Sequence, residues 1–171
     1  MKTITKISII VCAAFLALAA TGCAKGGKPD TEPGLTGHLM AREGGRILVI
    51  DTQAQDFSST GGVDSFYNAI WFSNAPEDIP LGETVSVWFD AVAESYPGQS
   101  EAIHVEVVPS EKPPGADLTQ AQALNLALTG PEYIQTSAVT SIAYEAETDL
   151  WTFGMQVLFE ETAYTITVAD E

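Results

Sequence analysis

Residues 37–51, with the sequence GHLMAREGGRILVID, decide the fold of this chain. Two segments rich in apolar residues, 37–43 and 46–51, flank the pair Gly44-Gly45. A two-residue glycine connection between such segments is typical of a β-hairpin, because the favoured hairpin turns need a positive φ that glycine adopts without strain. The sequence therefore predicts that the folded part of the chain opens with two antiparallel strands.

Three more segments up to residue 110 also predict strands. Residues 84–89 and 102–108 alternate between the two faces of a strand, and residues 65–73 are rich in aromatic and aliphatic side chains. We expect loops and turns in the polar or Pro- and Gly-containing stretches 52–64, 74–83 and 95–100. Five short strands within about 75 residues favour a small closed or nearly closed barrel, of which the OB-fold is the common five-stranded kind.

The spacing of apolar residues changes after residue 117, from the alternation of strands to the spacing of a helix. Thr119 and Gln122 form a capping box, and a helical face follows until Gly130-Pro131 ends it; this face carries Ala121, Leu124, Ala127 and Leu128. Strands are predicted over 139–144, 150–159 and 163–169; in the second, one face carries Trp151, Phe153, Met155, Val157 and Phe159. The predicted fold is mainly β: an OB-like barrel over 35–110, a linker over 111–117, and a small α+β unit over 118–171, with one helix on a three-stranded antiparallel meander.

The first residues form a secretory signal. Lys2 and Lys6 precede the apolar run 9–20, which is too short to span a bilayer comfortably. The run Leu18-Ala19-Ala20-Thr21-Gly22-Cys23 resembles the lipobox of bacterial lipoproteins, whose cysteine thiol carries diacylglycerol. The alternatives are a retained membrane helix or an ordinary signal cut near Ala20, and Cys23 argues against both. We therefore expect cleavage between Gly22 and Cys23, and a lipid anchor on Cys23 at the outer face of the cell membrane.

The composition limits what the mature part can do. Removing residues 1–22 from the 171 leaves 149 residues. Cys12 leaves with the signal and Cys23 carries lipid, so we expect neither a disulfide nor a Cys-ligated metal. Removing Lys2 and Lys6 from the seven basic residues leaves five against 23 acidic ones, a net charge of about −18. Such a body repels nucleic acid and tolerates cations or basic partners, and a solvated acidic surface is the favoured interpretation. Residues 23–34 read as a flexible tether, in which the eleven residues 24–34 reach roughly 35–40 Å when extended.

Four stretches of the barrel segment resemble the YobA-like family of Gram-positive bacteria, a domain of unknown function on small secreted or lipid-anchored proteins. They are Gly45–Ile50, Tyr67–Ser73, Val85–Asp90 and Ala93–Gln99, within residues 35–110. The resemblance implies a barrel fold and an extracytoplasmic place, and it implies no reaction or catalytic residue. Residues 117–171 look like half of a PepSY domain.

Few residues of the sequence are candidates for a catalytic, metal or anion site. His38 lies on the same predicted strand face as Arg42, and His104 on the same face as Glu106, so we expect both histidines to face solvent. A zinc site needs three or four converging ligands, and we predict none. Calcium binding in or beside loop 52–64 stays an open alternative, because Asp51, Asp56 and Asp64 lie there. The stretch Ser58–Gly62 could bind an anion through its backbone N–H groups, although a plain flexible loop is the favoured interpretation. We predict no catalytic residue and no cofactor.

Aromatic side chains remain as candidate ligand contacts, namely Trp71, Trp88 and Tyr96. Trp88 is the strongest of them, because it lies opposite the apolar face of its strand; the favoured alternative is that it packs against the second unit or the barrel end. We expect a non-enzymatic, lipid-anchored binding module whose ligand is a sugar, peptide or protein. The alternatives are a cell-envelope hydrolase that uses acidic residues not yet located, and a regulator of extracellular proteolysis.

Overall fold

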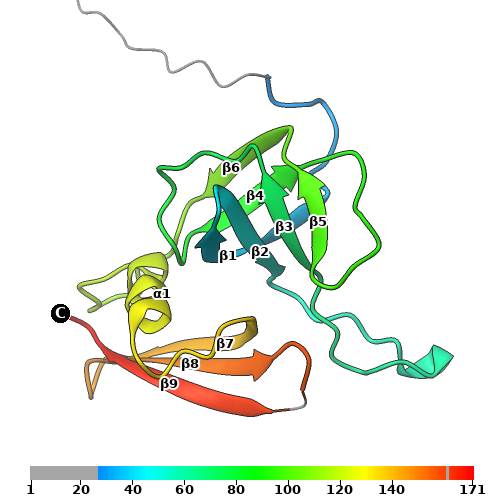
Figure 1. The fold of residues 1–171 in the computed structure, drawn as a ribbon. Coiled ribbons are helices and arrows are strands. Elements are labelled where there is room, and N and C mark those ends of the chain that lie inside the picture. The colour runs from blue at the N-terminus through cyan, green and yellow to red at the C-terminus, as the bar shows by residue number, and fades with distance from the viewer. Residues whose placement is uncertain (1–26, 161) are drawn as a thin grey trace, which may run out of the picture.

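The computed structural model describes residues 27–160 and 162–171, so the predicted signal, its cleavage site and Cys23 lie outside the described residues. The strands and helices, in chain order, are β1 (Leu35–Glu43), β2 (Arg46–Asp51), the short 3-10 helix η1 (Ser58–Thr60), β3 (Ala69–Ser73), β4 (Thr84–Trp88), β5 (Gly98–Glu101), β6 (His104–Val108), α1 (Gln120–Thr129), β7 (Ser137–Glu145), β8 (Leu150–Val157) and β9 (Ala163–Ala169). The chain is mainly β, as predicted. Figure 1 shows β1–β6 on one side and α1 with β7–β9 on the other.

One bent segment closes the first sheet, whose strand order is β5-β3-β2-β1-β4-β6. Strands β5 and β6 are two halves of residues 98–108: the first half pairs parallel with β3, and the second pairs antiparallel with β4. Between them, Ala102 N–H donates to the Ser73 carbonyl at 2.9 Å and Ile103 N–H to the Trp88 carbonyl at 2.8 Å. The two ends of the sheet are thereby joined into a barrel of five chain segments. The predicted turn over 95–100 is wrong at its end, because Gly98–Glu101 is a strand.

Strand β2 is buried on both faces. Ile47 and Val49 belong to the core inside the barrel, together with Phe72. Leu48 and Ile50 point to the other face and join a second core that includes Trp151. A strand that is buried on both faces reads as a continuous apolar run instead of an alternating one. The run ILVI at positions 47–50 is therefore the place where the barrel meets the rest of the chain.

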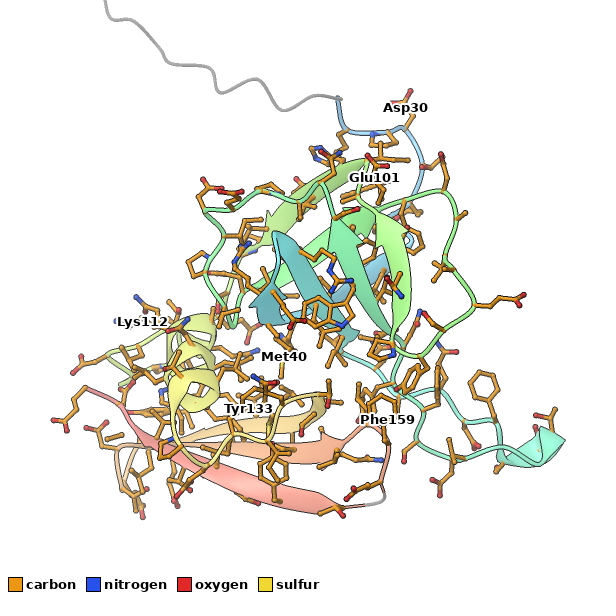
Figure 2. The ribbon with its side chains drawn as sticks, viewed as in Figure 1. Asp30, Met40, Glu101, Lys112, Tyr133 and Phe159 are labelled. Carbon is orange, nitrogen blue, oxygen red and sulfur yellow. The ribbon has the colours of Figure 1, made fainter. Side chains whose placement is uncertain are left out.

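A β-bulge in strand β1 corrects the expectation for the first histidine. The pairing with β2 shifts between Leu39 and Ala41, so Met40 is the extra residue. An inserted residue reverses the alternation of faces beyond it, so His38 and Arg42 lie on opposite faces. Met40 is buried in the second core, and Figure 2 shows it where the barrel meets the C-terminal unit.

The C-terminal unit forms as its sequence predicts. Helix α1 has both halves of the capping box of Thr119 and Gln122, and Gly130 is its C-cap. The strands have the order β7-β8-β9 and are antiparallel, and the buried face of α1 packs on them. Strand β8 ends at Val157, so Phe159 does not continue its buried face and is 57 % exposed. The prediction for Phe159 is wrong because the chain has already entered the turn to β9.

Direct contacts join the two units outside their shared core. The Asn125 side chain on α1 donates to the Leu81 carbonyl of the barrel at 2.9 Å. Gly82, with φ +87°, lies so close to α1 that a Cβ there would be 2.5 Å from the Ala121 carbonyl oxygen. A residue other than glycine would combine backbone strain with a clash at this position. The contact of the barrel with the helix therefore depends on Gly82.

Both predicted flexible segments are docked on the folded body. In the tether, the Trp88 indole N–H donates to the Thr31 carbonyl at 2.7 Å, and Lys28 forms an ion pair with Glu106 at 2.6 Å. In the linker, Ala116 is buried, and the backbone N–H groups of Asp117 and Leu118 donate to the Asp170 carboxylate. The free reach predicted for residues 23–34 is therefore too long, because the chain is already bound at Lys28.

Candidate functional site

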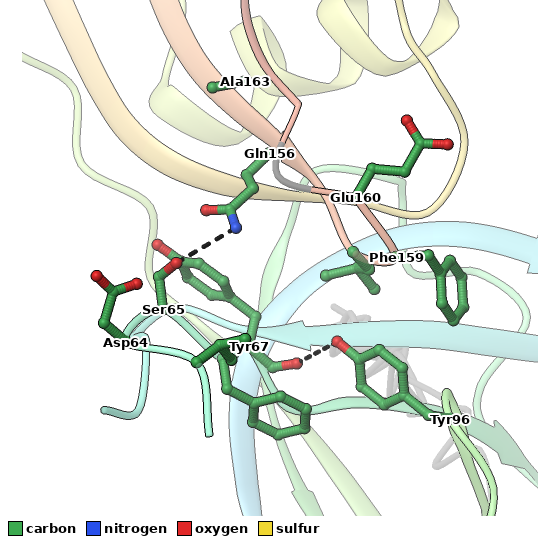
Figure 3. Close-up of a pocket in the computed structure, with 11 residues that line it drawn as sticks. Asp64, Ser65, Tyr67, Tyr96, Gln156, Phe159, Glu160 and Ala163 are labelled. Atoms are coloured by element: carbon green, nitrogen blue, oxygen red, sulfur yellow. Dashed lines mark hydrogen bonds between the residues drawn. The ribbon is translucent and has the colours of Figure 1, made fainter. Parts of the chain in front are cut away.

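A pocket of about 430 Å³ lies between the barrel and the C-terminal unit. Three separate segments line it, as Figure 3 shows: the end of the β2–β3 loop, the β4–β5 loop, and the end of β8 with the turn to β9. The lining residues are Val63, Asp64, Ser65, Phe66, Tyr67, Tyr96, Gln156, Leu158, Phe159, Glu160 and Ala163. The pocket falls within the size range of small-ligand sites and lies where such sites are common, between two packed units.

The β2–β3 loop folds back on itself before it reaches the pocket. Gln55 and Phe66 form an isolated antiparallel bridge, and Phe57 N–H donates to the Val63 carbonyl at 2.8 Å. At the loop tip, the Asp56 carboxylate accepts a 2.8 Å hydrogen bond from Ser58 N–H, and its hydrogen bonds to Ser58 lower the pKa of Asp56. These bonds give the predicted loop 52–64 a defined shape, and they direct Phe66 toward the pocket.

Aromatic rings form a continuous series across the pocket. The ring centroids of Phe57 and Phe66 are 5.7 Å apart, those of Phe66 and Tyr96 are 5.2 Å apart, and those of Tyr96 and Phe159 are 5.4 Å apart. These distances are those of favourable aromatic pairs, worth about 0.5–1.5 kcal/mol each beyond burial. The last pair joins the barrel to the C-terminal unit. Phe57 and Phe159 remain 42 % and 57 % exposed, so the series is open to solvent at both ends.

Hydrogen bonds position the polar groups of the pocket. The Tyr96 hydroxyl donates to the Tyr67 carbonyl at 2.7 Å, and the Gln156 amide donates to the Ser65 hydroxyl at 3.3 Å (Figure 3). Burial raises the pKa of Tyr96 to about 12, so its phenol stays protonated at neutral pH and keeps this donor role. Both bonds join residues of the pocket lining to one another, and they leave the open space of the pocket free for a ligand.

The charge of the lining is of one sign. Asp64 and Glu160 lie at the pocket and are exposed, and none of its eleven lining residues is Lys or Arg. Among the described residues, Asp64 has no hydrogen-bond or ion-pair partner, and Glu160 accepts only a 3.3 Å bond from the Thr162 hydroxyl. The pocket therefore presents aromatic surface beside carboxylates whose oxygens can still accept hydrogen bonds.

Tyr96 alone of the three aromatic candidates lines this pocket. Trp71 is half-buried, and the Arg46 guanidinium lies 5.2 Å from the centre of its ring. Trp88 is buried at 4 % exposure beneath the tether, with Lys28 at 5.1 Å over its ring and the His104 ring at 5.3 Å. Trp88 therefore offers a ligand no open ring surface, because residues 28–31 already cover its indole, in line with the favoured alternative that this side chain is packed.

His38 is not solvent-facing: it pairs with Ile50, on the face of β1 and β2 that carries the second core, and is 6 % exposed. Its Nδ1 lies 3.1 Å from the Thr84 hydroxyl, and burial lowers the pKa of His38 to about 4. His104 is half-buried and packs edge-on against Trp88. Within residues 27–160 and 162–171, no group of three or more His, Cys, Asp or Glu side chains lies close enough to hold a metal ion.

The acidic residues considered for calcium do not act together. Asp51 accepts a 3.0 Å hydrogen bond from Gln53 N–H, and Asp56 accepts one from Ser58 N–H, so each stabilises its own turn. Only Asp64 of the three lines the pocket. In the Ser58–Gly62 stretch, η1 is a single short turn, and Gly61 ends it in the left-handed conformation.

Of the eleven lining residues, only Asp64 and Tyr96 were singled out as site candidates from the sequence; the other nine include Phe66, Tyr67, Gln156, Phe159 and Glu160. Phe66 and Tyr67 were expected in a buried strand, whereas β3 begins only at Ala69. For Phe159, a signal was present in its acidic neighbours, since a large aromatic residue before Glu160-Glu161 is unusual inside a buried strand. Nothing in the sequence, however, brings Phe159 next to Tyr96.

Comparison with known proteins identifies the barrel. Residues 36–109 match the family described as "Protein of unknown function (DUF3221)", so the barrel segment is a DUF3221 domain. No curated protein and no solved structure matches the chain. In the part of the chain that the structure describes, no helix combines the length and apolar character needed to cross a bilayer.

Proposed function

We propose that this protein is a non-enzymatic, lipid-anchored binding module that holds a ligand at the outer face of the cell membrane. The observation that carries the proposal is the Tyr96–Phe159 pair, with ring centroids 5.4 Å apart, because it builds one pocket wall from two separately predicted units. Exposed aromatic surface inside a pocket is typical of binding sites, where it contributes apolar contact with little loss of conformational entropy.

The chemistry of the pocket supports binding more than catalysis. A glycoside hydrolase needs one carboxylic acid that stays protonated near neutral pH, which requires burial in apolar surroundings. Asp64 and Glu160 are both exposed. The Ser65 hydroxyl accepts from Gln156, and no histidine is among the lining residues to act as its base. The alternative of an envelope hydrolase is therefore the weaker proposal.

The proposed location rests on the sequence. The lipobox-like run ending at Cys23 and the resemblance to YobA-like lipoproteins both support a location outside the cytoplasm. In Figure 1 the first described residues enter at the end of the barrel away from β7–β9. An anchor on Cys23 would thus hold that end near the membrane and leave the opposite end facing outward.

Two measurements on cells test the proposal. An alkyne analogue of palmitate should label the wild-type protein and leave the Cys23→Ala variant unlabelled. A photo-reactive benzoylphenylalanine in place of Phe159 should form an adduct with an envelope component, and the same group in place of Val107, exposed on β6 outside the pocket, should not. Labelling that persists in Cys23→Ala would contradict the anchor. Adducts that are absent or equal at the two positions would contradict the binding site.

A further inference from the structure

We infer that the pocket binds the basic side chain, Lys or Arg, of a peptide segment that also carries a neighbouring apolar residue. This inference names the ligand class of the proposed binding site and rests on that proposal. It follows from the charge of the lining, the open aromatic surface and the apolar side chains beside the pocket.

The carboxylates set the sign of the ligand. Asp64 and Glu160 contribute two negative charges at the pocket, and no lining residue compensates them. The two ion pairs among the described residues, Lys28 with Glu106 and Arg46 with Glu43, involve no lining residue. The whole chain has a net charge of −16, so its long-range field has the same sign as the pocket. An anionic ligand is therefore repelled, and a cation is attracted both at a distance and in contact.

The rings favour a cation with an apolar stem. Aromatic faces attract ammonium and guanidinium groups when these lie within about 6 Å of the ring centroid. Lys and Arg also carry methylene chains that pack along apolar surface while the charged end stays near water. A side chain laid against Phe159 and Tyr96 would place its charge near the exposed carboxylates. A neutral sugar could stack on the same rings, but it would leave both carboxylates without a counter-charge.

The surroundings of the pocket indicate a peptide segment instead of a single cation. The pocket volume of about 430 Å³ exceeds what one side chain fills. Val63 lines the pocket and is 52 % exposed, and Phe57 donates its N–H to the Val63 carbonyl and extends the ring series outward. These exposed apolar side chains offer a contact to the residue beside the bound cation. The ligand thus combines a basic and an apolar residue.

Peptide titrations on the full-length protein in neutral detergent micelles test this inference. The probes are acetyl-Phe-Lys-Phe-Lys-amide and the same peptide with norleucine in place of both lysines, followed by calorimetry at low ionic strength. We expect the lysine peptide to bind at least about tenfold more tightly than the norleucine peptide, because each exposed charge contact adds a modest increment.

Variants link this difference to the pocket. The double variant Asp64→Asn/Glu160→Gln should bind the lysine peptide about five- to tenfold more weakly and the norleucine peptide unchanged. The matched control Glu77→Gln/Asp78→Asn makes the same charge change on an exposed loop outside the pocket and should leave both affinities unchanged. Phe159→Ala should weaken both peptides, with its melting temperature checked against wild type.

Two results would overturn the inference. One is equal affinity for the lysine and norleucine peptides. The other is binding of neutral chitotriose that depends on Phe159 and not on the two carboxylates, which would assign the pocket to sugars. Either result leaves the proposed binding function in place, provided that the photo-reactive group at position 159 still forms its adduct on cells. Loss of that adduct would remove the proposed function itself.

Discussion

The indole Nε1 of Trp88 donates a 2.7 Å hydrogen bond to the carbonyl oxygen of Thr31, which fixes the N-terminal segment to the barrel. Lys28 strengthens the attachment through its ion pair with Glu106, and this contact holds the pKa of Glu106 below its usual range. Only residues 24–27 then separate Lys28 from the proposed lipid on Cys23, a span of at most about 18 Å. The folded body would therefore stay close to the membrane surface.

Replacing Trp88 by Phe should loosen the docked segment. The variant keeps an aromatic ring but loses the hydrogen bond to Thr31, which costs about 1 kcal/mol of stability. Amide hydrogen exchange should become faster in residues 28–34 than in wild type. Trp71→Phe is the matched control, because Trp71 lies beside Arg46 and away from this segment. Unchanged exchange in residues 28–34 of Trp88→Phe would show that the indole does not hold the segment.

Replacing Gly82 by Ala should weaken the contact between the barrel and helix α1. The left-handed backbone alone costs Ala about 1 kcal/mol or more, and the Cβ would be 2.5 Å from the Ala121 carbonyl oxygen. Chemical denaturation should therefore show a loss of more than about 2 kcal/mol. Gly45→Ala is the control: it has φ +76° and open space around its Cβ, so it should lose only the backbone part. Equal losses in the two variants would mean that the helix contact adds nothing.

Buried His38 should make the protein less stable as the pH falls from about 6.5 to about 4. Its pKa is about 4 in the folded state and about 6.5 when unfolded, so the unfolded state binds more protons in this range. The stability contribution is complete above pH 6.5 and is lost as the pH falls through the folded pKa, by about 3 kcal/mol in total. Unfolding free energies of wild type and His38→Gln, measured from pH 7.5 to 4, should show a smaller decline for the variant. Parallel curves would contradict the assignment to His38.

Tyr133 carries a buried hydroxyl that makes no well-formed hydrogen bond among the described residues, although the backbone of Thr136 and Ser137 lies near it. Burial raises the pKa of Tyr133 to about 12, so the group stays neutral throughout the ordinary pH range. An unsatisfied buried hydroxyl costs about 1–3 kcal/mol, so Tyr133→Phe should leave stability unchanged or raise it by up to about 1 kcal/mol. Thermal unfolding checks this, with Tyr164→Phe as the contrast, because the Tyr164 hydroxyl contacts the Ser137 hydroxyl at 3.0 Å. A clear loss in Tyr133→Phe would reveal a partner for the hydroxyl.

Much of the fold was predictable because its signals are local. The glycine turn at 44–45, the alternation in β4 and the capping box at Thr119 depend on neighbouring residues, and each is confirmed in the structure. The strand that closes the barrel was predicted too short, because Gly98–Glu101 pairs parallel with β3 and parallel partners lie far apart in sequence. The bulge at Met40 was not foreseen, and one inserted residue was enough to put His38 and Arg42 on opposite faces of the strand.

Most of the candidate site could not be predicted from the sequence. Tyr96 was singled out, but its neighbours Phe66 and Phe159 come from segments 30 or more residues away. The pocket exists because the C-terminal unit packs on the outer face of the barrel through Leu48 and Ile50. Long-range packing of this kind leaves only an indirect trace, the unbroken apolar run in β2. The cover over Trp88 could not be foreseen either, because it is a segment whose composition is typical of a flexible tether.

The most direct test of the central claim is hydrogen exchange of the full-length protein with and without isolated cell envelope. The account predicts slower exchange in two separate segments when envelope is present, residues 61–68 and 156–163, because both line the pocket. Residues 140–145, on the far part of β7, serve as the internal control and should not change. Unchanged exchange in both lining segments, or protection confined to other surfaces, would contradict the claim that this pocket is the binding site.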